Sequence, residues 1–166
     1  MLETSTKIGS VTLAFPLTLD QVLANEPESL QELLNYLDEV KNHVIPARRD
    51  ALKAEISDLD HKRSRAWQSG QSIKEKFVKA QTKLSYYQRM GINEVVKDGV
   101  SLDIMTANME DLQKNEEAEY AKQVELAKQI RELEKELHTY VILEMKLNTR
   151  LRSKQELLGI NRPRQS

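Results

Sequence analysis

Apolar side chains recur at steps of three and four residues along most of the chain, which is the spacing of one face of an α-helix. One stripe follows Pro27 and runs to Val44. A longer stripe keeps a heptad phase without a slip, at Leu52, Ile56, Leu59, Arg63, Ala66, Gly70, Ile73, Phe77, Ala80, Leu84 and Tyr87. The pattern predicts a first helical arm over residues 27–90, opened by Pro27 in its first turn and kinked near Pro46, which cannot donate to the helical ladder.

A second helical arm is predicted over residues 102–159, after a turn at 91–101 that carries an Asp98-Gly99 signal. Gly159 and Pro163 mark where this arm ends. Its stripe starts at Leu102, Met105, Met109 and Leu112, is interrupted by a polar gap, resumes from Leu126 to Tyr140, and then drifts to Leu143, Leu147 and Leu151. Residues 160–166 form a basic C-terminal tail.

The N-terminal part has a different pattern. Residues 1–17 are expected to be extended or flexible, because apolar and small residues alternate from Val11 to Pro16. Two interpretations stay open, a frayed tail and a strand that docks on a partner or on the protein's own helices. A short helix is predicted at 18–26, with Thr18 as N-cap and Gln21 at the capping-box position.

Composition supports an all-α fold. Leu, Glu, Lys, Ala and Arg account for 76 of the 166 residues, whereas there are only 5 Gly and 4 Pro. The chain has no cysteine, no apolar run of membrane-spanning length and no signal-peptide pattern at Met1-Leu2-Glu3. We therefore expect a cytoplasmic or nuclear protein, neither secreted nor transmembrane.

Charge favours one way of pairing the two arms. Residues 46–90 carry a net charge of +6 and residues 102–138 carry −5, while residues 1–45 carry −5 and residues 139–166 carry +4. A parallel dimer in register would stack like charges, whereas folding back at 91–101 sets opposite blocks against each other. The predicted fold is thus an elongated antiparallel coiled-coil hairpin of two long helices, with Leu59 facing Leu133, Ile56 near Leu137 and Leu84 near Met109.

Two places along this hairpin are candidate contact sites. Ile73 and Phe77 fall opposite the polar gap, so they and their neighbours form a hypothetical partner or dimer contact: Ile73, Phe77, Val78 and Trp67. For Trp67 the plainer interpretation is core filler against the short helix. The turn holds a second apolar group, which either folds back as a plug or forms an end-on docking site: Ile92, Val95, Val96 and Val100.

The sequence offers little chemistry. His43, His61 and His138 lie far apart, and no nucleotide-binding or hydrolase motif is present. The clustered glutamates, including Glu132, Glu134 and Glu136, are interpreted as a solvated, salt-bridged face. We expect no enzyme, no cofactor and no metal site.

A basic group of five residues has two interpretations: Arg48, Arg49, Lys62, Arg63 and Arg65. The plainer one is pairing with the acidic opposite helix, with Arg63 at a core position fixing the register. The other is a face that binds anionic membrane surfaces. Nucleic acid is not expected, since the pI is 6.3 and aromatic residues are sparse there.

Architecture and surfaces together predict a structural or interaction protein. The pattern is generic to scaffold or spacer subunits of cytoskeletal, kinetochore or tethering-type assemblies. Its partners would be proteins, either a second copy in a homodimer or other subunits of a hetero-oligomer. A helical module for anionic membranes is the alternative.

Overall fold

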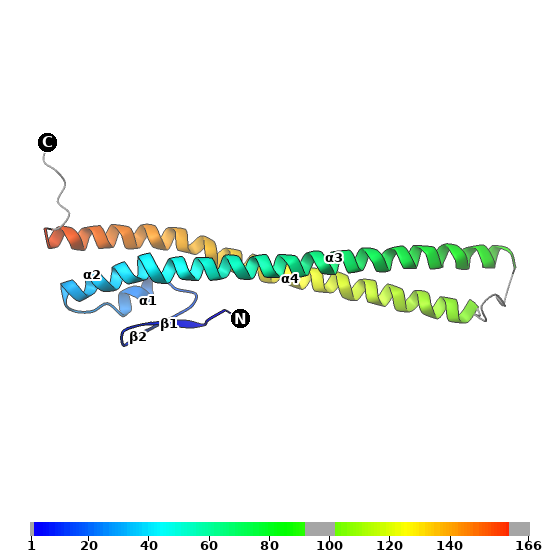
Figure 1. The fold of residues 1–166 in the computed structure, drawn as a ribbon, viewed down its shortest axis with the longest axis horizontal. Helices are drawn as coiled ribbons and strands as arrows, with labels where there is room; N and C mark the ends of the chain where they lie inside the picture. The colour runs from blue at the N-terminus through cyan, green and yellow to red at the C-terminus, as the bar shows by residue number, and fades with distance from the viewer. Residues whose placement is uncertain (1, 92–101, 160–166) are drawn as a thin grey trace, which may run out of the picture. The chain divides into compact units, whose positions relative to one another are not determined.

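The computed structural model describes residues 2–91 and 102–159. Its elements, in chain order, are β1 (Ser5–Ile8), β2 (Val11–Ala14), α1 (Leu19–Ala24), α2 (Leu30–Glu39), the π-helical segment η1 (Val40–Val44), α3 (Ile45–Arg89) and α4 (Leu102–Leu157) (Figure 1). The protein is mostly helical, as the sequence predicts, with two long helices that pack together and one two-stranded sheet.

The chain divides into two compact units. The first unit comprises residues up to 57 together with those from 131 onward, and the second unit comprises residues 58–130. The helices α3 and α4 contribute to both units. Each unit is described separately below.

The N-terminal segment of the first unit forms a β-hairpin. β1 pairs with β2 antiparallel, with Ile8 opposite Val11, so that Gly9 and Ser10 form a two-residue loop. Gly9 has a φ of 61°, a left-handed conformation that glycine adopts without a steric penalty. Leu13 on β2 is fully buried, which ties the hairpin to the helices.

Side-chain and backbone geometry set the starts of the next two helices. The Thr18 hydroxyl accepts a hydrogen bond from the Gln21 backbone N–H at 3.2 Å, which caps α1. α2 begins at Leu30 rather than at Pro27, and the predicted start is wrong by three residues. The reason is that Ser29 keeps an extended backbone, so no helical turn forms before it.

A π-helical segment ends two residues before Pro46, near which the sequence predicts a kink. In η1 the Ile45 backbone N–H donates to the carbonyl of Val40, five residues earlier. Proline lacks an N–H, and its ring crowds the carbonyl four residues before it. The wider π turn is one way a helix accommodates that crowding, so the helical backbone passes from α2 through η1 into α3.

The predicted seam of α3 is turned inward at nearly every position. Leu52, Leu59, Ala66, Gly70 and Leu84 are buried, and the remaining apolar members of the seam are half-buried: Ile56, Ile73, Phe77, Ala80 and Tyr87. The exception corrects a prediction, because Arg63 is exposed and pairs with Asp60 on its own helix at 2.6 Å. A guanidinium can leave the seam on its long stem, so Arg63 is not the core residue that was expected to fix the register.

In the second unit, polar side chains of α4 occupy the seam positions at which its apolar stripe is interrupted. Glu116, Glu119 and Gln123 are half-buried, whereas Tyr120 is exposed. A Cβ placed on Gly70 would lie 3.5 Å from Gln123 Nε2 and 3.7 Å from Glu119 Cβ. The absence of a side chain at Gly70 thus lets these two longer side chains of α4 approach the α3 backbone.

The main hydrophobic core lies in the first unit, where the N-terminal elements meet both long helices. Its buried residues come from every element of that unit except β1, whose Ile8 is partly buried against it: Leu13, Leu17, Val22, Leu33, Leu34, Tyr36, Leu37, Val40, Val44, Ile45, Leu52, Tyr140, Leu143, Leu147 and Leu151. The hairpin and α1 therefore close a core that α3 and α4 alone would leave open.

Candidate functional site

In the part of the chain that the structure describes, Arg48 at the start of α3 is the one charged residue that is buried. Its Nε and Nη2 donate to the two carboxylate oxygens of Glu136 on α4, at 2.7 and 3.0 Å. The hydroxyl of Tyr140, one turn further along α4, donates to the same carboxylate at 2.7 Å. This arrangement is a bidentate, charge-assisted pair with a third partner, and it fixes α3 against α4 in the first unit.

The same network holds the N-terminal segment. Arg48 Nη1 donates to the backbone carbonyl of Glu3 at 2.8 Å, and its guanidinium carbon lies 4.3 Å from the centre of the Phe15 ring. The backbone N–H of Leu17 donates to the Tyr140 hydroxyl at 3.1 Å. Arg48 and Tyr140 therefore connect the N-terminal segment to both long helices through three contacts, to Glu3, Phe15 and Leu17.

The network shifts the proton affinities of its members. Burial alone would raise the pKa of Glu136, but the hydrogen bonds from Arg48 and Tyr140 outweigh it, so its pKa lies below the usual 4.5. Burial, reinforced by the Glu136 carboxylate, raises the pKa of Tyr140 to about 12. The pair is thus ionised and Tyr140 is protonated at neutral pH.

A second ion pair anchors the loop after α1. The guanidinium of Arg150 on α4 binds both carboxylate oxygens of Glu26, and the Tyr36 hydroxyl donates to the Val22 carbonyl at 2.9 Å. Burial and the nearby Glu26 raise the pKa of Tyr36 to about 12. These contacts tie α1, the loop after it, α2 and α4 together in the first unit.

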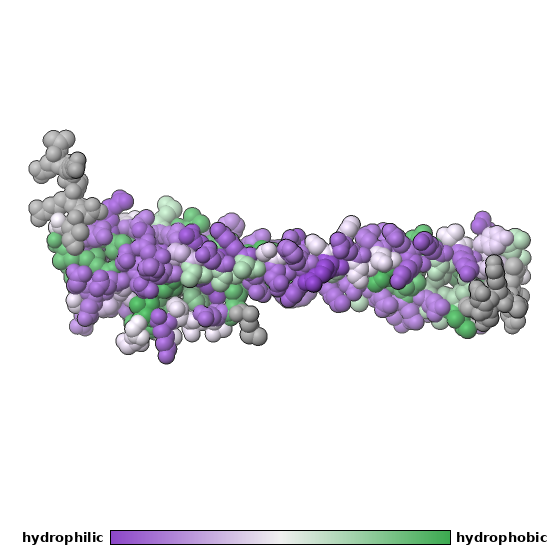
Figure 2. Space-filling view, viewed as in Figure 1, coloured by the Kyte–Doolittle hydropathy of each residue, from purple (hydrophilic) through white to green (hydrophobic). Residues whose placement is uncertain are grey.

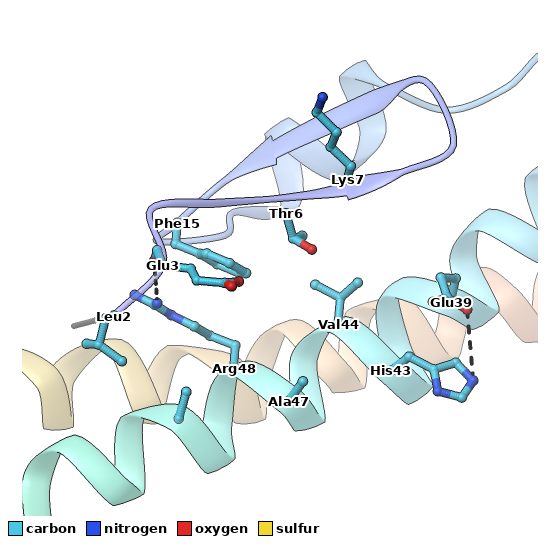
Figure 3. Close-up of a pocket in the computed structure, with 11 residues that line it drawn as sticks. Leu2, Glu3, Thr6, Lys7, Phe15, Glu39, His43, Val44, Ala47 and Arg48 are labelled. Carbon is cyan, nitrogen blue, oxygen red and sulfur yellow. Dashed lines mark hydrogen bonds and ion pairs between the residues drawn. The ribbon is translucent and has the colours of Figure 1, made fainter.

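A groove of about 410 Å³ lies between the hairpin and the helices of the first unit (Figure 3). The hairpin side contributes Leu2, Glu3, Thr6, Lys7 and Phe15, and the helical side contributes Glu39, His43, Val44, Ala47, Arg48 and Ala51. The helical wall includes the end of η1, and π-helical turns are frequent at functional sites.

The polar groups that line this groove mostly make contacts within the protein itself. His43 Nε2 lies 3.9 Å from a Glu39 carboxylate oxygen, and both side chains are largely exposed. Figure 3 shows the His43 ring turned toward Glu39 and away from Thr6, the hydroxyl of the groove. Arg48 already uses three of its five N–H donors on Glu136 and Glu3, and Glu136 balances its charge, so it is poorly placed to bind an anionic ligand.

The basic residues that the sequence singled out separate into three kinds. Arg48 and Arg49 pair with Glu136 and Glu144 of α4, which agrees with pairing to the opposite helix. Lys62 and Arg63 instead pair with Asp58 and Asp60 of their own helix, and Arg65 is exposed. Arg48 does not belong to a lipid-facing surface, because it is buried and its charge is neutralised.

The apolar residues proposed as a contact site differ in exposure. Trp67 is 55% exposed, so its interpretation as core filler against the short helix is wrong. It follows the seam residue Ala66 by one position, about 100° around the helix, and so lies at the side of the helix pair and outside the seam. Val78 is also exposed, whereas Ile73 and Phe77 are half-buried. Ile92, Val95, Val96 and Val100 lie outside the described residues.

Sequence reasoning missed the inward role of Glu136, which was grouped with the solvated glutamates. One signal was available, because Glu136 lies one turn before the buried seam residue Tyr140. The hairpin partner strand β1 was missed as well. Its signal is the Gly9-Ser10 pair between two short β-type runs.

The second unit contains a shallow groove of about 500 Å³ along one side of its helix pair. It is lined by Lys62, Arg65, Ala66 and Ser69 of α3 and by Glu119, Lys122, Glu125 and Leu126 of α4. Its polar lining includes two acidic and three basic side chains, which gives it no dominant charge.

Among residues 2–91 and 102–159, no group of three or more acidic, histidine or cysteine side chains is placed to hold a metal ion, and no helix is long and apolar enough to cross a membrane. No protein-family model, curated protein or solved structure matches this chain.

The buried pair makes a prediction about stability. Arg48→Met leaves the Glu136 carboxylate buried without its cation and should lower the free energy of unfolding by about 3–5 kcal/mol. The double variant Arg48→Met/Glu136→Leu should recover most of that loss. Urea unfolding followed by circular dichroism measures both. Arg49→Met is the matched control, because the Arg49–Glu144 pair is more exposed and should cost about 1 kcal/mol or less.

A pH titration tests the same carboxylate. The pKa of Glu136 is lower in the folded chain than in the unfolded one, so its stabilising contribution is complete above the unfolded value and is lost as pH falls through the folded value. Between about pH 5 and pH 2, the wild type should therefore lose more stability than Glu136→Gln. Parallel stability curves for the two proteins over that range would contradict the assignment.

Proposed function

We propose that this chain is a non-enzymatic structural or interaction protein, a scaffold or spacer subunit of a larger assembly of cytoskeletal, kinetochore or tethering type. In this proposal α3 and α4 form an antiparallel coiled-coil hairpin that presents side chains to protein partners. The observation that carries the proposal is Trp67, an exposed tryptophan on a helix pair. The seam residues of that pair are mostly buried or half-buried.

Contacts within each unit support the antiparallel pairing. In the first unit Arg49 of α3 pairs with Glu144 of α4 at 3.0 Å. In the second unit Gly70 of α3 lies against Glu119 and Gln123 of α4. Seam positions spaced by three and four residues are buried or half-buried on both helices, which is the pattern of coiled-coil packing.

Exposed apolar side chains support a protein-binding role for the second unit. Trp67 on α3 and two residues one turn apart on α4, Tyr120 and Val124, are each more than half exposed. None of the three lines the shallow groove, and helical periodicity places all three on the other side of the helix pair. Figure 2 shows a mostly hydrophilic surface with scattered hydrophobic side chains on this unit, in a colouring that does not mark tryptophan or tyrosine as hydrophobic. Exposed tryptophan and tyrosine are typical anchors of protein interfaces.

The membrane alternative has less support. Of the five basic residues that motivated it, Arg48 and Arg49 pair with α4, and Lys62 and Arg63 pair with aspartates of α3. Neutralised and dispersed cations give little attraction to anionic lipid, because each free cation near the surface contributes only about 1 kcal/mol.

An engineered disulfide tests the hairpin. A Cβ added at position 70 would lie 3.7 Å from Glu119 Cβ, which suits a disulfide, and the chain has no native cysteine. Gly70→Cys/Glu119→Cys should form an intramolecular bond that raises the free energy of unfolding by about 2–4 kcal/mol. Non-reducing gel mobility and urea unfolding measure these two effects.

The control pair is Gly70→Cys/Glu117→Cys, because Glu117 is exposed and lies two positions from Glu119, on the far side of α4. This pair should stay reduced under the same mild oxidation. Intermolecular dimers from the Glu119 pair, in place of the intramolecular bond, would refute the hairpin in favour of pairing between chains.

Quantitative affinity capture tests the partner surface. Trp67→Ser/Tyr120→Ser removes two exposed aromatic rings without touching the seam, so the variant should fold normally. Loss of an anchor residue costs about 2 kcal/mol or more, so captured partners should fall by roughly thirtyfold or more. Leu157→Ser is the control, because it removes an apolar side chain that is more exposed than either ring but lies at the end of α4 in the first unit. Equal capture by all three proteins would contradict this surface.

A further inference from the structure

The part of α4 in the first unit is apolar on two sides. One side packs into the core through Tyr140, Leu143, Leu147 and Leu151. The other side exposes three large apolar residues, Val141, Ile142 and Met145, with exposed fractions of 53%, 58% and 66%. Figure 2 shows hydrophobic side chains at the surface of this unit as well. A helix with a second apolar side is typical of one that packs against a further helix.

Charged residues flank these three in a particular order. Arg131 and Glu134 precede them, and Arg152 and Glu156 follow them. The spacing places all seven on one face of the helix, which we call the outer α4 face: Arg131, Glu134, Val141, Ile142, Met145, Arg152 and Glu156. The four charged residues are exposed, and none of them forms an ion pair with another described residue.

The order of these charges is self-complementary when the helix is turned end over end. With the two-fold axis near residue 143, Arg131 lies opposite Glu156 of the second copy, and Glu134 lies opposite Arg152 of the second copy. Symmetry repeats each pair, which gives four attractive contacts. The same register sets Met145 against Val141 and Ile142 of the second copy, so the apolar residues meet at the centre.

We propose that the outer α4 face binds the same face of a second copy of this chain, with the two α4 helices antiparallel. The occupant follows from the charge order. A parallel pair in register would oppose Arg131 to Arg131, Glu134 to Glu134 and Arg152 to Arg152 of the second copy. The antiparallel arrangement replaces each of these repulsions with an attraction.

The remaining positions of the face are compatible with this interface. His138 and Thr149 occupy the steps between the charged and apolar groups, and they lie opposite each other in the same register. Both are exposed, so neither is needed for the core of its own chain. A contact with an apolar centre and a charged rim has the general form of a protein interface.

One helix pair makes a small interface, so we expect moderate affinity, with a dissociation constant of about 1–100 µM. The interface lies in the first unit and does not use Trp67, Tyr120 or Val124 of the second unit. It goes beyond the proposed function and does not rest on it, since a scaffold can bind partners as a single copy.

Sedimentation equilibrium on charge-swapped variants tests the pairing. At about 5–500 µM the wild type should be in monomer–dimer equilibrium. Glu134→Arg and Arg152→Glu each replace two attractive contacts by two repulsive ones and should each weaken the dimer by about tenfold or more. The double variant Glu134→Arg/Arg152→Glu should return to within about threefold of the wild type. An equimolar mixture of the two single variants should associate more strongly than either alone.

Two matched valines test the apolar centre. Val141 and Val124 both lie on α4 and both have an exposed fraction of 53%, but only Val141 belongs to the outer α4 face. Val141→Asp should weaken the dimer by about tenfold or more, and Val124→Asp should leave it unchanged. Because both side chains are exposed, the helix content from circular dichroism should stay constant.

Three results would overturn the proposal. The first is a wild type that stays monomeric at the highest concentration. The second is a dimer that neither single charge swap weakens, or that the double swap does not restore. The third is a dimer that Val124→Asp dissolves while Val141→Asp leaves it intact, which would place self-association in the second unit.

Discussion

The architecture of the first unit depends on neutralising one buried cation. The side chain of Arg48 extends from α3 into the core, and a buried guanidinium is strongly destabilised unless partners satisfy its charge. Glu136 supplies the charge, Tyr140 satisfies the carboxylate further, and the Glu3 carbonyl accepts the remaining guanidinium branch. Because these groups come from α3, α4 and the N-terminal segment, satisfying Arg48 requires three distant parts of the chain to come together at once. A hydrophobic core alone tolerates sliding, whereas a bidentate pair accepts one register.

The helices themselves were predictable because their cause is local. Steps of three and four between apolar residues identify a helix face wherever the chain folds, so both long helices and most of the α3 seam follow from the sequence. The exception at Arg63 is instructive. The heptad phase assigns a position on the helix surface, but a long charged side chain at that position can reach Asp60 and water instead of the core. Periodicity predicts where the Cβ atom of a residue lies, but it does not predict where a long side chain places its charged group.

What escaped prediction depends on contacts between distant residues. Glu136 looked like one more solvated glutamate, because its partner Arg48 is 88 positions away. The hairpin and its docking likewise required knowledge of what Phe15 and Leu17 would meet. For Trp67, the interpretation as core filler rested on the average behaviour of tryptophan, but a helix pair has too little interior to bury a side chain one position away from the seam. In each case the local pattern was correct and the missing information was tertiary.

A two-helix element also explains why exposed apolar residues gather on this chain. Each helix in a pair buries one stripe and leaves more than half of its circumference in water. In the first unit the hairpin and α1 cover part of that surface, and Leu13, Leu17 and Val22 are buried as a result. They do not reach Val141, Ile142 and Met145. A sequence under no demand for contact there would be expected to place polar residues at those positions, as it does at Lys146 and Asn148 between the two stripes. Three adjacent large apolar side chains in that setting, bracketed by oppositely ordered charges, are better explained by a partner than by the fold.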